Sequence, residues 1–220
     1  MKNSQKAGFY PILINLQKFR CMVVGGGKVA HRKVISLLHF GADITVLSPK
    51  IIKPIQELAN NNSIRIIKKA YSEEYIDGYG IVFSATDNPE INQTVRKDCT
   101  DKRILLNVVD DPILCDFILP ANVIRGDLTL SISSQGKAPF FSKKMKEKVE
   151  GLIPPVYEDI IHLAGQLRDK ITHNQNIDPK LKARILKEFT SKNWEEILSG
   201  NGSDSPDNHL KEILSEFNLE

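Results

Sequence analysis

The chain contains 220 residues, of which 41% are hydrophobic, and it carries a formal net charge of +3. This length is enough for one substantial core and a second small one, and the small charge gives no reason to expect nucleic-acid binding. No apolar stretch approaches the roughly 20 residues that cross a bilayer. The N-terminal residues lack the long apolar region and the small-residue cleavage site of a signal peptide, so we expect no membrane association.

The three cysteines (Cys21, Cys99 and Cys115) are widely spaced and form no C-x-x-C motif. Their odd number, and the position of Cys21 inside a predicted strand, indicate reduced thiols and a cytoplasmic protein. The five histidines are scattered without metal-ligand spacing, so we expect no metal site.

Strands and helices alternate through the first half of the chain. The apolar runs predict strands at Phe19–Val24, Ile44–Leu47, Ser63–Lys68, Ile81–Ala85 and Ile104–Val109, and helices at Lys28–Phe40, Ile51–Ala59 and Pro89–Thr100. Strands that are apolar on both faces and alternate with helices predict a parallel sheet covered by helices. Such a sheet binds ligands at the carboxyl ends of its strands. Those ends are followed here by the loops Gly25–Lys28, Ser84–Asn88 and Val109–Pro112.

The first predicted strand leads into a glycine fingerprint. The segment Cys21–Ala30 reads CMVVGGGKVA, with Gly25, Gly26 and Gly27 in a G-x-G-x-x-A pattern. Between a strand and an amphipathic helix, this pattern is typical of a dinucleotide site in which helix N–H groups hold the pyrophosphate. We expect Gly25 to permit the tight turn and Gly27 to leave room for phosphate. A glycine turn without a ligand is the alternative, and the surrounding strand, helix and second strand favour dinucleotide binding.

The end of the second strand carries Ser48, Pro49 and Lys50. A classical NAD site has an acidic residue there to hold the ribose hydroxyls, whereas Asp43 lies at the opposite end of the strand. Ser48 can hydrogen-bond a ribose hydroxyl, and Lys50 can tolerate a 2′-phosphate. These residues therefore leave the choice between NAD and NADP open.

The fourth strand is followed by Thr86 and Asp87, which offer polar contacts beside a nicotinamide ribose. The same turn also has the pattern of a helix start, with a cap at Asp87 or Asn88 and Pro89 in the first helical position. One turn can both cap a helix and contact the cofactor, so the helix cap and the ribose contact are compatible interpretations.

Two adjacent acids, Asp110 and Asp111, follow the fifth strand. Paired carboxylates at the carboxyl end of a central strand are suited to general acid–base chemistry. The alternative is an Asp-Asp-Pro turn with both acids in solvent, and the sequence favours neither.

The pattern changes after these acids. Two β-rich runs, Phe117–Val123 and Leu128–Ser133, are joined by Arg125-Gly126-Asp127, which predicts an antiparallel hairpin with a surface for pairing. From Pro139 onward the chain reads as helices, the first of them basic, with an apolar stripe in the second. Basic residues here are more often a solvated face, but they are also the cations available to a polyanionic ligand.

Several motifs occur in the order found in the precorrin-2 dehydrogenase family of the siroheme-synthase N-terminal type, which the chain therefore resembles. They are YPILINLQKFRCMVVGGGKVAHRK, SATDNPEIN, NVVD, DFILPA, LTLSISSQGKAP and AGQLRDK. The resemblance implies an α/β fold with three parts. These are a Rossmann-like NAD-binding domain (1–112) with a parallel sheet, an antiparallel dimerisation and tetrapyrrole region (113–150), and a C-terminal helical domain (151–220).

The resemblance also implies a function, namely oxidation of precorrin-2 to sirohydrochlorin by a homodimer with NAD as hydride acceptor. It assigns Asp110 as the catalytic aspartate and Ser134 to the tetrapyrrole region, where we add Arg125 and Lys137 as substrate-binding cations. Asp111 stands where some members have a small residue, so its role is open. The cofactor-binding positions implied are Gly25, Gly26, Gly27, Lys28, Val29, Ser48, Pro49, Lys50, Thr86 and Asp87.

Two alternatives differ from this function. The first is a bifunctional enzyme that is both a dehydrogenase and a sirohydrochlorin ferrochelatase, since some members of the family also insert iron into sirohydrochlorin, whereas others pass it to a separate chelatase. A non-catalytic NAD-sensing module would also carry the fingerprint, but it would leave Asp110, the SISSQGKAP motif and the basic helix unexplained.

Overall fold

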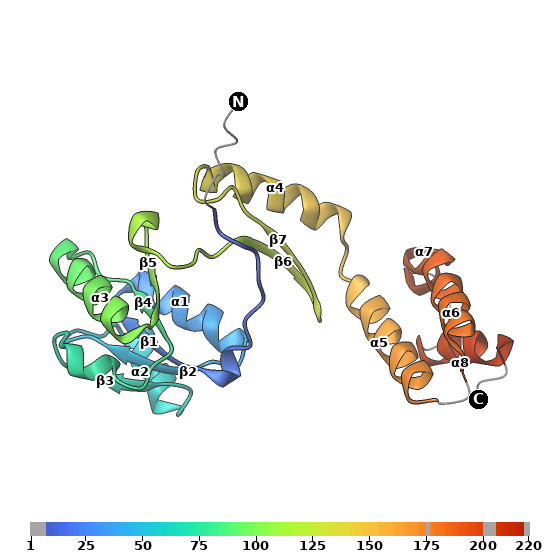
Figure 1. Ribbon diagram of the computed structural model, residues 1–220, viewed down its shortest axis with the longest axis horizontal. Coiled ribbons are helices and arrows are strands. Elements are labelled where there is room, and N and C mark those ends of the chain that lie inside the picture. The colour runs from blue at the N-terminus through green and yellow to red at the C-terminus, as the bar shows by residue number, and fades with distance from the viewer. Residues whose placement is uncertain (1–7, 175–176, 200–205, 218–220) are drawn as a thin grey trace. The chain divides into compact units, whose positions relative to one another are not determined.

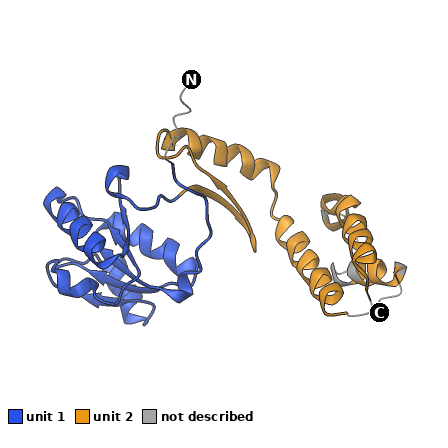
Figure 2. Ribbon diagram, in the orientation of Figure 1, with its two compact units in different colours: residues 1–119 blue, residues 120–220 orange. Residues whose placement is uncertain are grey.

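The structure is a computed structural model that describes residues 8–174, 177–199 and 206–217. It divides into two compact units, residues 1–119 and 120–220 (Figure 2). Within the described residues, no helix combines the length and the apolar character that crossing a membrane requires.

The first unit is built on a five-stranded parallel sheet with the strand order β3-β2-β1-β4-β5 (Figure 1). The strands are β1 (Arg20–Val24), β2 (Asp43–Leu47), β3 (Arg65–Ile67), β4 (Ile81–Ser84) and β5 (Leu105–Val108). Because the chain places β2 on one side of β1 and β4 on the other, a topological switch point lies at the carboxyl ends of β1 and β4. Ligands of open α/β sheets bind at such a point.

Helices cover both faces of the sheet. The helices of this unit are α1 (Lys28–His39), α2 (Lys53–Asn60) and α3 (Pro89–Lys102), with 3₁₀ turns at Leu16–Lys18, Glu73–Ile76 and Pro112–Leu114. One buried cluster joins Val23 of β1 to Val34 of α1, and the other joins Met22 of β1 to Val95 of α3. Neighbouring residues of one strand thus pack into opposite layers, which explains why the strands are apolar throughout.

The second unit begins with an antiparallel hairpin of β6 (Ala121–Arg125) and β7 (Leu128–Ile132), joined at Gly126 and Asp127. The sequence predicts that the first hairpin strand begins at Phe117, which is wrong because β6 begins at Ala121. Phe117 instead packs edge-to-face on Phe83 in the first unit, with ring centroids 5.5 Å apart. Helix α4 (Pro139–Leu152) packs against both strands.

The remaining helices of the second unit share one core. They are α5 (Tyr157–His173), α6 (Pro179–Ser191), α7 (Trp194–Ser199) and α8 (Pro206–Glu216). The predicted apolar stripe is confirmed, because Leu163 and Leu167 of α5 are fully buried against Ile185 of α6 and Ile213 of α8.

Candidate functional site

The glycine loop between β1 and α1 is shaped by two close backbone contacts. Gly25 has a φ of 120°, and a Cβ there would lie 2.4 Å from the carbonyl oxygen of Ala85. A Cβ on Gly26 would lie 2.1 Å from the carbonyl oxygen of Lys50. A Cβ on Gly27 would meet nothing within 4 Å. The first two glycines are therefore required by the loops after β4 and β2, and the third borders open space.

Helix α1 begins directly behind this open space. Gly27 is its N-cap residue and, within the part of the chain that the structure describes, no side chain caps the helix. The N–H groups of the first turn, from Lys28 to Ala30, therefore have no intrahelical or capping partner. Free N–H groups at a helix N-terminus, next to a glycine that borders open space, fit the pyrophosphate of a dinucleotide.

The loop after β2 is closely held at Ser48. The nearly buried Ser48 donates its hydroxyl proton to the carbonyl oxygen of Lys50 at 2.9 Å, which shapes the turn against Gly26. The hydroxyl oxygen still has lone pairs to accept from a ribose. Pro49 and Lys50 are exposed. Asp43 forms an ion pair with Arg65 at the amino end of the strand, away from this loop.

A side-chain network fixes the loop after β4. The buried Ser84 hydroxyl donates to Oδ1 of Asn92 at 2.6 Å, and Nδ2 of Asn92 donates to the carbonyl oxygen of Thr86 at 3.4 Å. Of the two predicted caps, Asn88 is the one used, since its side chain accepts the N–H groups of Glu90 and Ile91 at 2.9 and 3.3 Å. Asp87 is thereby left exposed.

The two acids after β5 have different surroundings. Asp110 is exposed and has a left-handed backbone, with a φ of 63°. Asp111 is half-buried and uses Oδ1 to accept the N–H of Ile113 at 3.2 Å, which caps the 3₁₀ turn Pro112–Leu114. The structure thus gives Asp111 a structural contact and presents Asp110 to solvent at the carboxyl edge of the sheet.

A short return segment, residues 115–117, covers the open side of β5. Cys115 Sγ accepts the N–H of Val108 at 3.1 Å, and Asp116 Oδ2 accepts the N–H of Leu106 at 3.0 Å. Burial raises the pKa of the Cys115 thiol, so the protonated sulfur can also donate to the carbonyl oxygen of Asp111, 3.2 Å away. These contacts satisfy the edge of the sheet and fix the turn that carries Asp110. The sequence analysis did not identify them.

The candidate residues of the second unit lie at opposite ends of the hairpin. Ser134 Oγ accepts the N–H of Ala138 at 2.9 Å, and the exposed Lys137 lies in the same turn. Arg125 lies beside the hairpin turn, where its guanidinium donates to the carbonyl oxygens of Ile153 at 2.8 Å and Glu150 at 3.4 Å. Arg125 therefore caps the C-terminal end of α4, and the structure does not bring it together with Ser134.

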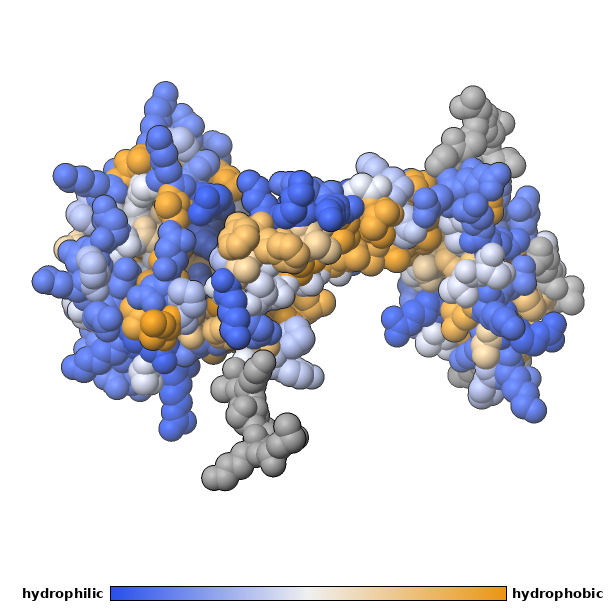
Figure 3. Space-filling model, turned by 90° about the horizontal axis from the view of Figure 1, so that it is seen from above, coloured by the Kyte–Doolittle hydropathy of each residue, from blue (hydrophilic) through white to orange (hydrophobic). Residues whose placement is uncertain are grey.

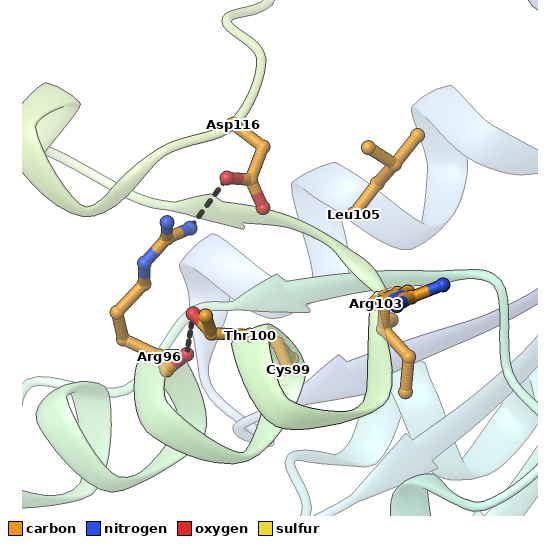
Figure 4. Close-up of a pocket in the computed structure, with 7 residues that line it drawn as sticks. Arg96, Cys99, Thr100, Arg103, Leu105 and Asp116 are labelled. Atoms are coloured by element: carbon orange, nitrogen blue, oxygen red, sulfur yellow. Dashed lines mark hydrogen bonds and ion pairs between the residues drawn. The ribbon is translucent and has the colours of Figure 1, made fainter.

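A separate hollow of about 300 Å³ lies beside α3 and the start of β5 (Figure 4). Arg96 and Asp116 form an ion pair across it at 2.6 Å, and Arg103 and Leu105 lie at its other side. It is at the amino end of β5, opposite the edge that carries Asp110. Among the described residues, no cluster of three or more His, Cys, Asp or Glu side chains is arranged to hold a metal ion.

Sequence comparisons identify siroheme synthases as relatives, which confirms the resemblance predicted from the motifs. The siroheme synthase of Psychrobacter sp. (strain PRwf-1) is 38% identical over 195 residues, covering 89% of this chain and 38% of that protein. The siroheme synthase of Ruthia magnifica subsp. Calyptogena magnifica is 36% identical over 193 residues, covering 87% of this chain and 39% of that protein. This chain thus spans about two fifths of the length of the curated relatives it matches.

A solved structure described as SirC, precorrin-2 dehydrogenase, has the same fold. It matches with a TM-score of 0.76 and 24% sequence identity, covering 94% of this chain and 100% of that chain. The predicted fold, a Rossmann-like parallel sheet followed by an antiparallel hairpin and a helical region, is confirmed. A family model described as putative NAD(P)-binding matches residues 12–121, which is half of the chain. The glycine loop, the sheet and this match together show that the chain belongs to that NAD(P)-binding family.

Proposed function

We propose that the chain catalyses the NAD-dependent oxidation of precorrin-2 to sirohydrochlorin in siroheme biosynthesis, and that it does so in the cytoplasm. The observation that carries the proposal is the position of Asp110, an exposed carboxylate at the sheet edge where the glycine loop leaves open space. The similarity to siroheme synthases and to a solved precorrin-2 dehydrogenase supports this choice of substrate.

The proposed reaction removes one hydride and one proton from the tetrapyrrole. NAD, when bound, accepts the hydride. The carboxylate of Asp110 accepts the proton and later releases it to water. The N–H groups of Lys28 and Val29 hold the pyrophosphate beside Gly27, and Gly25 and Gly26 keep the loop close to its neighbours. Ser48, Pro49 and Lys50 face the adenosine ribose, and Thr86 and Asp87 lie on the nicotinamide side.

For the polyanionic substrate we propose contacts with Ser134 and Lys137, which share the turn before α4. An exposed lysine beside a hydroxyl group suits a carboxylate ligand. Because the guanidinium of Arg125 is already bonded to carbonyl oxygens, we assign it to support of the hairpin instead of substrate binding.

The activity itself separates an enzyme from an NAD-sensing module. Purified protein supplied anaerobically with precorrin-2 and NAD is expected to form sirohydrochlorin and NADH, followed by their absorption spectra. NAD binding measured by calorimetry, without any turnover of precorrin-2, would instead support the sensing module.

We also propose a homodimer, because the second unit exposes a large apolar surface. Phe140 is 78% exposed and Leu152 is 72% exposed, at opposite ends of α4. Figure 3 shows hydrophobic side chains in a continuous band beside a strongly hydrophilic strip on this part of the surface. Exposed apolar area of this kind marks an interaction site.

Light scattering at micromolar concentration should give twice the 24.7 kDa of one chain, and a mass equal to one chain would contradict the dimer.

Iron insertion is the second candidate function, because the same carboxylate can collect pyrrole protons as a metal enters. We propose that the chain is a dehydrogenase alone and that a separate chelatase takes its product. Sirohydrochlorin with Fe²⁺ or Co²⁺, without NAD, should then be metallated no faster than in a protein-free control. Faster metallation that is lost in Asp110→Ala would show that the chain carries both activities.

A further inference from the structure

The carboxyl ends of β1, β2 and β3 lie side by side at one edge of the sheet. The last residues of the three strands are register partners, namely Val24, Leu47 and Ile67. The backbone continues this row by one residue, because the N–H of Gly25 donates to the carbonyl oxygen of Leu47 at 2.9 Å. In the same way, the N–H of Ser48 donates to the carbonyl oxygen of Ile67 at 3.1 Å. Lys68 follows Ile67 directly, so it adjoins Ser48 in the row that begins with the glycine loop.

The loop after β2 is in direct contact with the glycine loop. The N–H of Ile52 donates to the carbonyl oxygen of Gly26 at 3.0 Å. A Cβ on Gly26 would lie 3.0 Å from the Cβ of Ser48 and 2.1 Å from the carbonyl oxygen of Lys50. Residues 48–52 are thus fixed against the loop that we assign to the pyrophosphate. In sheets of this kind, the adenosine ribose of a dinucleotide lies at the end of the second strand, which is this position.

The charged residues that follow β2 and β3 are all positive. Residues 48–53 and 68–71 contain four lysines and neither aspartate nor glutamate. Two of these lysines already have partners. Lys53 forms an ion pair with Glu57 at 3.7 Å, and the ammonium group of Lys69 lies over a tyrosine ring, 5.5 Å from its centroid. The other two lysines are the cations that a ligand at this edge can use.

These two cations, Lys50 and Lys68, both lie next to Ser48. Both side chains are exposed, and within the part of the chain that the structure describes neither ammonium group has an ion-pair or hydrogen-bond partner. The Ser48 hydroxyl donates its proton to the carbonyl oxygen of Lys50, so its oxygen can accept from a ribose hydroxyl. A phosphate group also only accepts, so a phosphate on this ribose would be held by the two lysines instead of Ser48.

We propose that Lys50 and Lys68 determine the cofactor specificity, and that they let the site take NADP in place of NAD by holding its 2′-phosphate. An acidic residue at the end of β2 would bind the ribose hydroxyls of NAD and repel this phosphate. The acid of β2, Asp43, lies instead at the amino end of the strand, in an ion pair with Arg65. The inference rests on the proposed function for the reaction and changes only the cofactor, since NADP accepts the hydride at the same nicotinamide ring.

Isothermal titration with NADP and with NAD measures the specificity. NADP is expected to bind the wild-type protein more tightly than NAD, and this advantage should shrink between about 0.01 M and about 1 M salt, because salt screens exposed charges. In Lys50→Glu and in Lys68→Glu, NADP affinity should fall roughly tenfold, because reversing a charge beside a doubly charged phosphate multiplies the small effect of one exposed ion pair. NAD lacks this phosphate and should lose roughly threefold or less.

Lys18→Glu is the matched control. Lys18 is also exposed, but it precedes β1 and lies at the amino edge of the sheet, opposite Ser48. The substitution makes the same change of charge, and the ratio of NADP to NAD affinity should stay at the wild-type value. An equal loss of NADP and NAD affinity in the Lys50 and Lys68 variants, or the same change of the ratio in Lys18→Glu, would overturn the proposal.

Phosphorus NMR of bound NADP detects the contact itself, without any turnover. Neighbouring ammonium groups favour the dianion of the 2′-phosphate, so the pKa of its second ionisation should be lower in the complex than in free NADP. In Lys50→Glu this pKa should rise again. A bound 2′-phosphate that titrates as in free NADP would contradict the proposal.

The inference and the proposed function can fail separately. If NADP and NAD bind as expected but precorrin-2 is oxidised with neither, the proposed reaction is wrong and the assignment of the two lysines stands. If NAD supports the oxidation while NADP does not bind, the proposed reaction stands and the assignment of the two lysines is wrong.

Discussion

Replacing Asp110 by Asn is expected to lower the turnover of precorrin-2 by about 10²–10⁴-fold, the usual contribution of a positioned proton acceptor. The amide keeps the size of the side chain but cannot accept the proton. Asn also tolerates the left-handed backbone at this position, where φ is 63°, so the turn should keep its shape. Steady-state kinetics with precorrin-2 measures the loss, and NAD affinity should barely change.

Asp111→Asn is the matched control for this substitution. Asp111 caps a 3₁₀ turn by accepting the N–H of Ile113, and the carbonyl oxygen of Asn can accept the same hydrogen bond. Activity should therefore be retained. A similar loss of turnover in both variants, or a loss of NAD binding in Asp110→Asn equal to its loss of activity, would show that Asp110 is structural.

Replacing Gly27 by Asp is expected to weaken NAD binding by roughly 100-fold or more, because a carboxylate placed against a pyrophosphate costs several kcal/mol. A Cβ at Gly27 meets nothing within 4 Å, so the new side chain enters the open space without displacing the loop. Isothermal titration with NAD measures the loss, and the thermal unfolding midpoint of the free protein should be nearly unchanged.

Gly165→Asp provides the control for the added charge. Gly165 lies exposed on α5, and a Cβ there also meets nothing within 4 Å. Its replacement adds the same side chain and charge to the second unit, which does not contain the glycine loop, and NAD affinity should stay at the wild-type value. Unaltered NAD affinity in Gly27→Asp would mean that the dinucleotide does not lie over this loop.

The sheet and the glycine loop could be predicted because their signals are local. The apolar run of β1 is followed at once by the glycines, and the apolar run of β4 is followed at once by polar residues. The position of Asp110 follows from the same logic, since carboxyl ends of parallel strands share one edge.

The supporting contacts could not be predicted, because they join side chains to backbone groups far away in the sequence. Nothing around Arg125 indicates that it bonds the end of α4, and nothing around Asp116 indicates that it satisfies the N–H of Leu106. The choice of Asn88 over Asp87 as helix cap is a local contact, but the sequence could not decide it because both residue types cap well and the backbone conformation selects between them.

The stoichiometry of the reaction tests the central claim most directly. In an anaerobic mixture of wild-type protein, precorrin-2 and NAD, the amounts of NADH and sirohydrochlorin formed are measured together over time. The account predicts equal amounts of the two products at every time point, and no sirohydrochlorin above the protein-free control when NAD is left out. Sirohydrochlorin formed at the same rate without NAD, or no product despite bound NAD, would contradict it.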